Sequence, residues 1–159
     1  MRILRPEQVL TDGGLSSGLE VVLAGDRIQT LRPATGPVDL PGRALLPGFV
    51  NAHSHAFQRG LRGHVQWARG EDDFWSWRER MYGLANGLDA DGIEAVSALA
   101  FLEMVEAGFT SVGEFHYLHH LPEGHPYADR EELALRVARA ARSVGLRIRL
   151  LRVAYQRAG

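Results

Sequence analysis

The sequence contains no cysteine and no lysine, and each absence excludes some chemistry. Without cysteine, the chain forms no disulfide and offers no thiolate to a metal, so any metal site has to use other ligands. Without lysine, it cannot form a Schiff base with a carbonyl substrate. All 18 basic residues are therefore arginine.

Long apolar runs and a strong excess of charge are also absent. No apolar run approaches the roughly 18 residues that span a bilayer, and the first residues lack the apolar segment of a secretory signal. The formal net charge is -1, which gives no reason to expect nucleic acid or an anionic membrane as a partner. With 45% hydrophobic and 23% charged residues, we expect a folded globular domain. Because the sequence shows neither a secretory signal nor cysteine, the expected compartment is the cytoplasm.

The N-terminal 47 residues show the pattern of short β-strands. Residues 19–23 are apolar or β-branched except for Glu20, residues 24–26 indicate a turn, and residues 27–31 alternate polar and apolar side chains. We therefore predict a β-hairpin at 19–31. Two more features follow it: a connection rich in proline and glycine at 33–42 and a short strand at 44–46.

From residue 48 onward, the pattern changes to alternating strands and helices. The predicted elements are a buried strand at 49–52, helices at 73–86 and 89–107, a strand at 110–115, a loop at 116–126, a third helix that Asp129 caps, and a strand at 146–153. Asp89 is the predicted N-cap of the second helix. This order is typical of a parallel sheet built from β-α-β units, so we predict an α/β fold.

Two histidines directly follow the strand predicted at 49–52, within the stretch LPGFVNAHSHAFQRG. Residues i and i+2 of a strand point to the same face, so His53 and His55 would aim both imidazoles at one point. Parallel α/β barrels build their active sites at this end of their strands. Two imidazoles suit zinc, iron or a similar metal. The alternative is a pair of exposed loop histidines that binds no metal.

The segment LPGFVNAHSH resembles the first barrel strand of the amidohydrolase superfamily. In that family, a small β-sandwich precedes a (β/α)8 barrel, and the His-x-His pair of the first strand binds a catalytic metal. The resemblance implies that His53 and His55 are ligands of zinc, with iron as the alternative metal. It also implies that residues 1–47 form part of the sandwich and that residues 48–159 form the first three β/α units of an incomplete barrel.

Three stretches are similar to one group within this superfamily, the formimidoylglutamate deiminases: HAFQR at 55–59, DFWSWRE at 73–79 and EFHYLHH at 114–120. The resemblance implies hydrolysis of N-formimino-L-glutamate to N-formyl-L-glutamate and ammonia, a reaction of histidine degradation. It further implies a homodimer and a substrate pocket lined by Gln58, Arg78 and Tyr117. Arg78 would bind a substrate carboxylate through its planar fork.

Each of these side chains also fits a purely structural role. Gln58 could begin a helix, and Arg78 could pair with Glu79 or Asp73 on a solvated helix face. Tyr117 could pack on its own loop. The neighbouring His116, His119 and His120 are either polar lining or solvated loop residues, or they form a second metal site, and Glu114 has no assigned role.

A complete (β/α)8 barrel needs about 250 residues, and residues 48–159 supply less than half of that. The family takes a third histidine ligand, an aspartate ligand and the acid/base glutamate from later strands. We therefore expect the N-terminal part of a longer enzyme, inactive by itself, with no general acid or base in this chain. The alternatives are another deaminase of the superfamily, related to guanine deaminase, and a non-catalytic barrel remnant that needs a complementing chain.

Overall fold

The computed structural model describes residues 1–66 and 74–154. Its contacts divide the chain into two compact units, Met1–Pro47 and Gly48–Gly159. Within the described ranges, the first unit contains strands only, whereas the second contains strands and helices. None of the helices in these ranges is long and apolar enough to cross a membrane.

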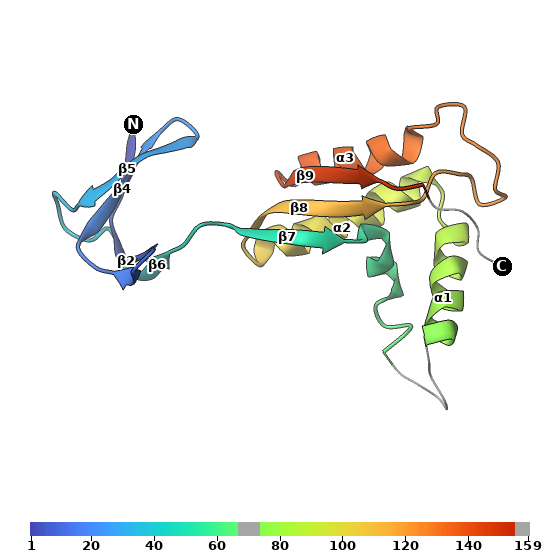
Figure 1. Ribbon diagram of the computed structural model, residues 1–159, viewed down its shortest axis with the longest axis horizontal. Coiled ribbons are helices and arrows are strands. Elements are labelled where there is room, and N and C mark those ends of the chain that lie inside the picture. The colour runs from blue at the N-terminus through green and yellow to red at the C-terminus, as the bar shows by residue number, and fades with distance from the viewer. Residues whose placement is uncertain (67–73, 155–159) are drawn as a thin grey trace. The chain divides into compact units, whose positions relative to one another are not determined.

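The first unit is built from two three-stranded sheets (Figure 1). In one sheet, β4 pairs antiparallel with β1 and β5; in the other, β2 pairs antiparallel with β3 and parallel with β6. The strands are β1 (Arg2–Leu4), β2 (Pro6–Thr11), β3 (Gly14–Ser16), β4 (Leu19–Ala24), β5 (Arg27–Pro33) and β6 (Leu40–Leu45).

The predicted hairpin is confirmed, because β4 and β5 pair on either side of Gly25. Gly25 has a φ of 61°, a conformation that glycine adopts without steric cost. The predicted connection at 33–42 was wrong at its end, since β6 already begins at Leu40. Strand β6 begins before the apolar residues 44–46 because it pairs with β2, which lies far away in the sequence.

One buried carboxylate, that of Glu20, ties the first unit together. Its oxygens accept hydrogen bonds from Arg5 Nε and Arg32 Nε, both at 2.8 Å, and from the Thr35 backbone N–H at 3.1 Å. The Thr35 N–H, together with the two arginines, lowers the pKa of Glu20 to about 2 although burial opposes the shift. A charge this well partnered is tolerated at a fully buried position.

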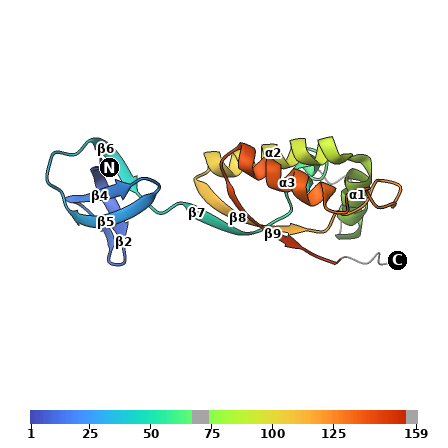
Figure 2. The ribbon, with the colours of Figure 1, turned by 90° about the horizontal axis from the view of Figure 1, so that it is seen from above.

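The second unit is a parallel three-stranded sheet with two long helices on one face (Figures 1 and 2). The sheet order is β7-β8-β9, and α2 and α3 cover the same face. The sheet stays open in the described residues and does not close into a barrel. The elements are β7 (Phe49–Ser54), the 3₁₀ helix η1 (Ala56–Leu61), α1 (Phe74–Gly87), α2 (Ala90–Glu106), β8 (Phe109–His116), α3 (Glu132–Ser143) and β9 (Arg147–Arg152).

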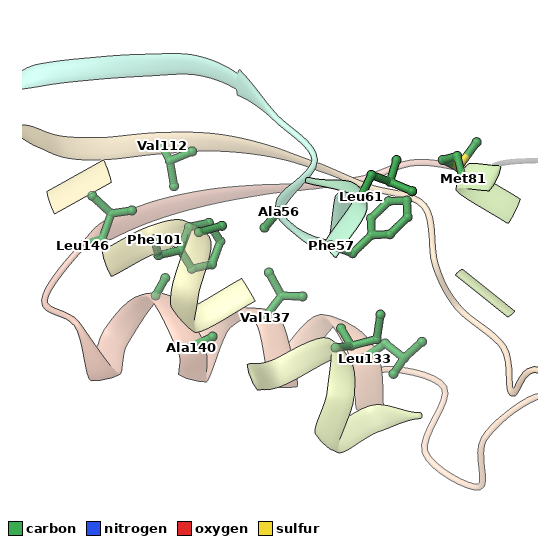
Figure 3. Close-up of a cluster of buried hydrophobic side chains, with 13 residues drawn as sticks. Ala56, Phe57, Leu61, Met81, Phe101, Val112, Leu133, Val137, Ala140 and Leu146 are labelled. Atoms are coloured by element: carbon green, nitrogen blue, oxygen red, sulfur yellow. The ribbon is translucent and has the colours of Figure 1, made fainter. Parts of the chain in front are cut away.

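The core of the second unit lies between the sheet and these helices (Figure 3). Phe101 of α2 is completely buried, and Val112 of β8 meets the helices from the sheet side. Val137 and Ala140 of α3 are buried, and their spacing of three residues places them on one face of this helix. The small side chain of Ala140 favours close packing of α3 against α2 and the sheet.

The three predicted helices are present, but the N-cap predicted for one of them is wrong. Asp89 caps α2 as predicted, because its side chain accepts the Gly92 N–H at 2.8 Å. Helix α3, in contrast, begins after Glu131, and the Asp129 side chain binds the Glu131 N–H in the turn before the helix. The first helix begins at Phe74; Asp73, its predicted first residue, lies outside the described residues.

Strand β7 was predicted to be buried, but its start is exposed. Phe49 and Val50 are 53% and 68% exposed, because β7 is an edge strand and the helices cover only one face of the sheet. The pairing of β7 with β8 is irregular between Asn51 and Ser54. Such irregularities re-aim side chains at the ends of strands, and this one lies next to the histidine pair.

Candidate active site

The imidazoles of His53 and His55 converge at the end of β7. Their Nε2 atoms lie 3.1 Å apart, and both rings pack on Phe115 of the neighbouring strand β8, with centroids 5.5 and 5.3 Å away. Ser54, between the two histidines, is buried. The end of β7 therefore presents two imidazole nitrogens to one point.

The tautomer of His55 follows from its second ring nitrogen. Nδ1 lies 3.1 Å from the backbone carbonyl of Phe115, and a carbonyl oxygen can only accept. Nδ1 therefore carries the hydrogen and Nε2 keeps its lone pair, as metal-binding histidines are usually held. Partial burial lowers the pKa of His55, and the proximity of His53 acts in the same direction, so the neutral ring is favoured.

The pair fits two ligand positions of a zinc ion. Two nitrogens at about 2.0–2.1 Å from a tetrahedral zinc lie about 3.3 Å apart, close to the observed 3.1 Å between the two Nε2 atoms. A catalytic zinc takes three protein ligands and a water. The described part of the chain contains no group of three or more side chains that could hold a metal ion, so a metal bound by this pair would need further ligands from elsewhere.

Gln58 and Tyr117 meet beside His55. Gln58 Nε2 donates to the Tyr117 hydroxyl at 3.0 Å. The Tyr117 ring lies edge-on to the His55 ring at 5.1 Å, and its hydroxyl contacts the sulfur of Met81 in α1 at 3.8 Å. Two of the three predicted substrate-binding residues are thus brought together, 59 positions apart in the sequence, next to the predicted metal ligand.

Arg78 lies on α1, the helix that also contacts Tyr117 through Met81. Its guanidinium donates to the Tyr82 hydroxyl at 3.1 and 3.3 Å and lies over the Tyr82 ring at 5.1 Å and the Trp75 ring at 5.5 Å. Stacking on aromatic rings holds a guanidinium in place while it stays charged. Its role as a carboxylate clamp stays a prediction.

Glu114, to which the sequence assigned no role, holds the backbone that follows the histidine pair. Its Oε1 accepts the Ala56 N–H at 2.7 Å, and the residue is 2% exposed. Burial raises the pKa of Glu114, whereas the Ala56 N–H and the Ser54 side chain oppose the shift. The two bonded residues lie on different elements, so no local sequence pattern indicates the contact.

A second missed contact fixes η1 against α2. Arg59 donates to both carboxylate oxygens of Glu103, each at 2.6 Å, and Arg62 joins the same carboxylate at 3.3 Å. Bidentate arginine–carboxylate pairs have a defined geometry, so this pair sets the direction in which the chain leaves the histidines. Gln58 immediately precedes Arg59 and is positioned with it.

The predicted histidine-rich loop is in part a strand. His116 is the last residue of β8 and is 4% exposed, and its ring contacts that of His119 at 5.2 Å. His119 donates from Nε2 to the Val153 carbonyl at 2.8 Å. Burial lowers the pKa of His116 to about 4, with smaller contributions from His119 and Arg152. Among the described residues, these histidines form no cluster that could hold a metal.

Comparison with known proteins decides the family. Residues 44–158 match the model of the amidohydrolase family, which covers most of the chain and both histidines. The chain belongs to the amidohydrolase family. The superfamily resemblance of LPGFVNAHSH is therefore confirmed.

Particular relatives refine this placement. The chain is 40% identical to the formimidoylglutamate deiminase of Pseudomonas aeruginosa over its whole length, which is 36% of that protein. It superposes on an amidohydrolase from Brucella melitensis with a TM-score of 0.85 and 39% identity, over 95% of this chain and 34% of that one. The chain thus spans about a third of the length of these relatives.

A more distant structure shares the fold. Atrazine chlorohydrolase from Arthrobacter aurescens, solved in complex with zinc, superposes with a TM-score of 0.77 at 21% identity, over 96% of this chain and 35% of the other. At this identity, the likeness supports the fold alone. The mixed α/β prediction is confirmed, whereas a closed barrel is not present in the described residues.

Proposed function

We propose that this chain is part of a zinc-dependent hydrolase that converts N-formimino-L-glutamate and water into N-formyl-L-glutamate and ammonia. In this proposal, residues 48–159 contribute the first β/α units of a (β/α)8 barrel. The observation that carries it is the convergence of the His53 and His55 Nε2 atoms, 3.1 Å apart, beside the Gln58–Tyr117 hydrogen bond. The 40% identity to a formimidoylglutamate deiminase supports the choice of substrate.

The histidine pair would hold the metal. A bound zinc ion acts as a Lewis acid and makes a nucleophilic water available near neutral pH. His53 and His55 would each give an Nε2 lone pair, and the Phe115 carbonyl keeps the His55 ring in the tautomer and orientation that binding requires. Glu114 fixes the Ala56 backbone and thereby the turn that directly follows the two histidines.

The neighbouring polar groups would orient the substrate. The amidine nitrogens of formiminoglutamate are hydrogen-bond donors, which suit the amide oxygen of Gln58 and the hydroxyl oxygen of Tyr117. A substrate carboxylate matches the fork of Arg78, which Trp75 and Tyr82 hold by stacking. Holding both ends of the substrate fixes the formimidoyl carbon beside the histidine pair and lowers the entropic part of the barrier.

The proposal is tested by measuring ammonia release by the full-length gene product, loaded with zinc, from formiminoglutamate and from guanine. We expect release from formiminoglutamate and a kcat/KM for guanine that is lower by orders of magnitude. Arg78→Ala should reduce kcat/KM on formiminoglutamate by about 10- to 100-fold, as loss of a charged hydrogen bond predicts.

Arg80→Ala is the matched control for Arg78→Ala. Arg80 lies on the same helix, but its guanidinium donates to the His64 carbonyl at 2.7 Å, so the substitution should leave kcat/KM nearly unchanged. If guanine is the better substrate and Arg78→Ala has no effect, the enzyme acts on a heterocycle and the proposed substrate is wrong.

A further inference from the structure

Three residues that line one small cavity each carry a buried side-chain polar atom without a hydrogen-bond partner. The atoms are Ser97 Oγ, Glu114 Oε2 and His116 Nε2. Their residues are 0%, 2% and 4% exposed, so bulk water does not reach them. A buried polar atom without a hydrogen-bond partner destabilises the folded state, and three such atoms on residues that line one cavity point to a small polar ligand between them.

The cavity has room for a single water. Its volume is about 10 Å³, at the lower end of the roughly 10–15 Å³ that one water needs. The three polar residues share the lining with residues of η1, α2 and α3 and with residues at and after the end of β8: Phe57, Ile93, Val137, Phe115, Tyr117 and Leu118. An apolar wall with three polar atoms on the remaining sides suits a water, but leaves no space for a larger ligand.

We propose that this cavity binds one ordered water that bridges Ser97 Oγ, Glu114 Oε2 and His116 Nε2. The donors and acceptors balance with His116 as the tautomer that carries its hydrogen on Nδ1: the water donates one hydrogen to the Glu114 carboxylate and one to His116 Nε2, and it accepts the Ser97 hydroxyl hydrogen. Three hydrogen bonds are typical for a buried water. The site joins Ser97 of α2 to Glu114 and His116 of β8.

The bound water supports the histidine pair through Glu114. That carboxylate bonds the Ala56 N–H with Oε1 and the water with Oε2, so both of its oxygens are fixed. Ala56 directly follows His55. The water is therefore linked through Glu114 to the Ala56 backbone, next to a predicted metal ligand, and it keeps the Glu114 side chain from rotating away from that backbone.

A crystal structure of the full-length gene product at about 1.5 Å resolution tests the proposal. We expect one ordered water at about 2.6–3.2 Å from each of the three atoms. A dry cavity would overturn the proposal, as would a direct hydrogen bond between Glu114 Oε2 and His116 Nε2. The unmodified protein decides this question, so the test does not depend on a variant that folds.

Ser97→Val supplies a second test. The larger apolar side chain fills the cavity and removes the hydroxyl, so the water should be lost from the density of the variant. Ser143→Ala is the control, because the Ser143 hydroxyl bonds the Ala140 carbonyl within α3 and is not part of the cavity lining. Persistence of the water in Ser97→Val would contradict the three-bond arrangement.

Discussion

At the scale of single residues, the site is organised by side chains that support the histidine pair as much as by the pair itself. His55 is oriented by the Phe115 carbonyl, and the turn after it is fixed by Glu114. Tyr117 connects this group to α1 through Met81 and accepts a hydrogen bond from Gln58. The positions of these residues are thus mutually dependent before any substrate binds.

Tyr117→Phe tests the part that the hydroxyl plays. The ring contacts with His55 and Phe57 should persist, while the hydrogen bond from Gln58 is lost. We expect kcat/KM on formiminoglutamate to fall about 10-fold, the cost of one hydrogen bond of about 1–1.5 kcal/mol. Tyr127→Phe is the control, and an equal loss of activity in both variants would show that the Tyr117 hydroxyl has no specific role.

Glu114→Ala tests the support of the turn. Removal of the carboxylate leaves the Ala56 N–H buried without its partner, so the free energy of unfolding should decrease by about 1–3 kcal/mol. Zinc affinity should fall as well, by about 10- to 100-fold, as is usual for groups that orient a ligand. Chemical denaturation and zinc titration measure the two effects.

The exposed Glu123 offers a control for Glu114→Ala, since Glu123→Ala should change neither quantity by more than about 0.5 kcal/mol. An unchanged zinc affinity in Glu114→Ala, in a protein that still folds, would contradict the supporting role of this carboxylate.

At the scale of elements, the second unit depends on how its helices begin and pack. Asp89 accepts the Gly92 N–H at the start of α2, and this cap follows directly from the sequence. We expect Asp89→Ala to lower the free energy of unfolding by about 1 kcal/mol in urea denaturation. Asp89→Asn keeps a capping oxygen and should lose much less; an equal loss in both variants would contradict the cap.

Elements that depend on a local sequence pattern could be predicted, whereas contacts between residues far apart in the sequence could not. The hairpin at 19–31 and the helix from Asp89 are local, so both were predicted. The β2–β6 pairing, the Glu114–Ala56 hydrogen bond and the Arg59–Glu103 pair join residues far apart in sequence, and none of them was. Asp129 satisfied the pattern of a cap, yet its carboxylate binds the turn before α3.

The candidate site was predictable to a similar degree. Strand alternation alone predicted that His53 and His55 would converge, and their Nε2 atoms do lie 3.1 Å apart. Their role as metal ligands stays a prediction, as do the roles of Gln58, Arg78 and Tyr117, which rest on the resemblance. The buried positions of Glu114 and His116 could not be read from their neighbours, because burial depends on how α2 and α3 pack on β8.

At the scale of the whole molecule, the two units should respond to acid in different pH windows. His116 has its pKa lowered from 6.5 to about 4, so the second unit should lose stability as the pH falls through this range. As the pH falls from 6.5 to 4, this histidine takes up a proton in the unfolded chain before it does so in the folded one. The resulting loss in the free energy of unfolding is at most roughly 3 kcal/mol. Glu20 has its pKa lowered from 4.5 to about 2, so the first unit should lose stability between these values.

Hydrogen exchange of backbone amides as a function of pH separates the two windows. His116→Gln should reduce the loss of amide protection between pH 6.5 and 4, and only in the second unit. His125→Gln, at an exposed position, serves as its control. Glu20→Gln should remove the loss of amide protection below pH 4.5 in the first unit, and it should lower the stability of that unit at neutral pH. A loss of protection in both units over one common range would contradict this assignment.

The most direct test of the account is the zinc content and zinc affinity of the full-length gene product and its histidine variants. We predict about one zinc per catalytic site, and a loss of affinity of at least about 100-fold in both His53→Asn and His55→Asn, beyond the 10- to 100-fold typical of supporting residues. His64→Asn, at an exposed histidine outside the pair, should bind zinc normally. Undiminished zinc binding by His53→Asn and His55→Asn would contradict the central claim that this pair holds the metal.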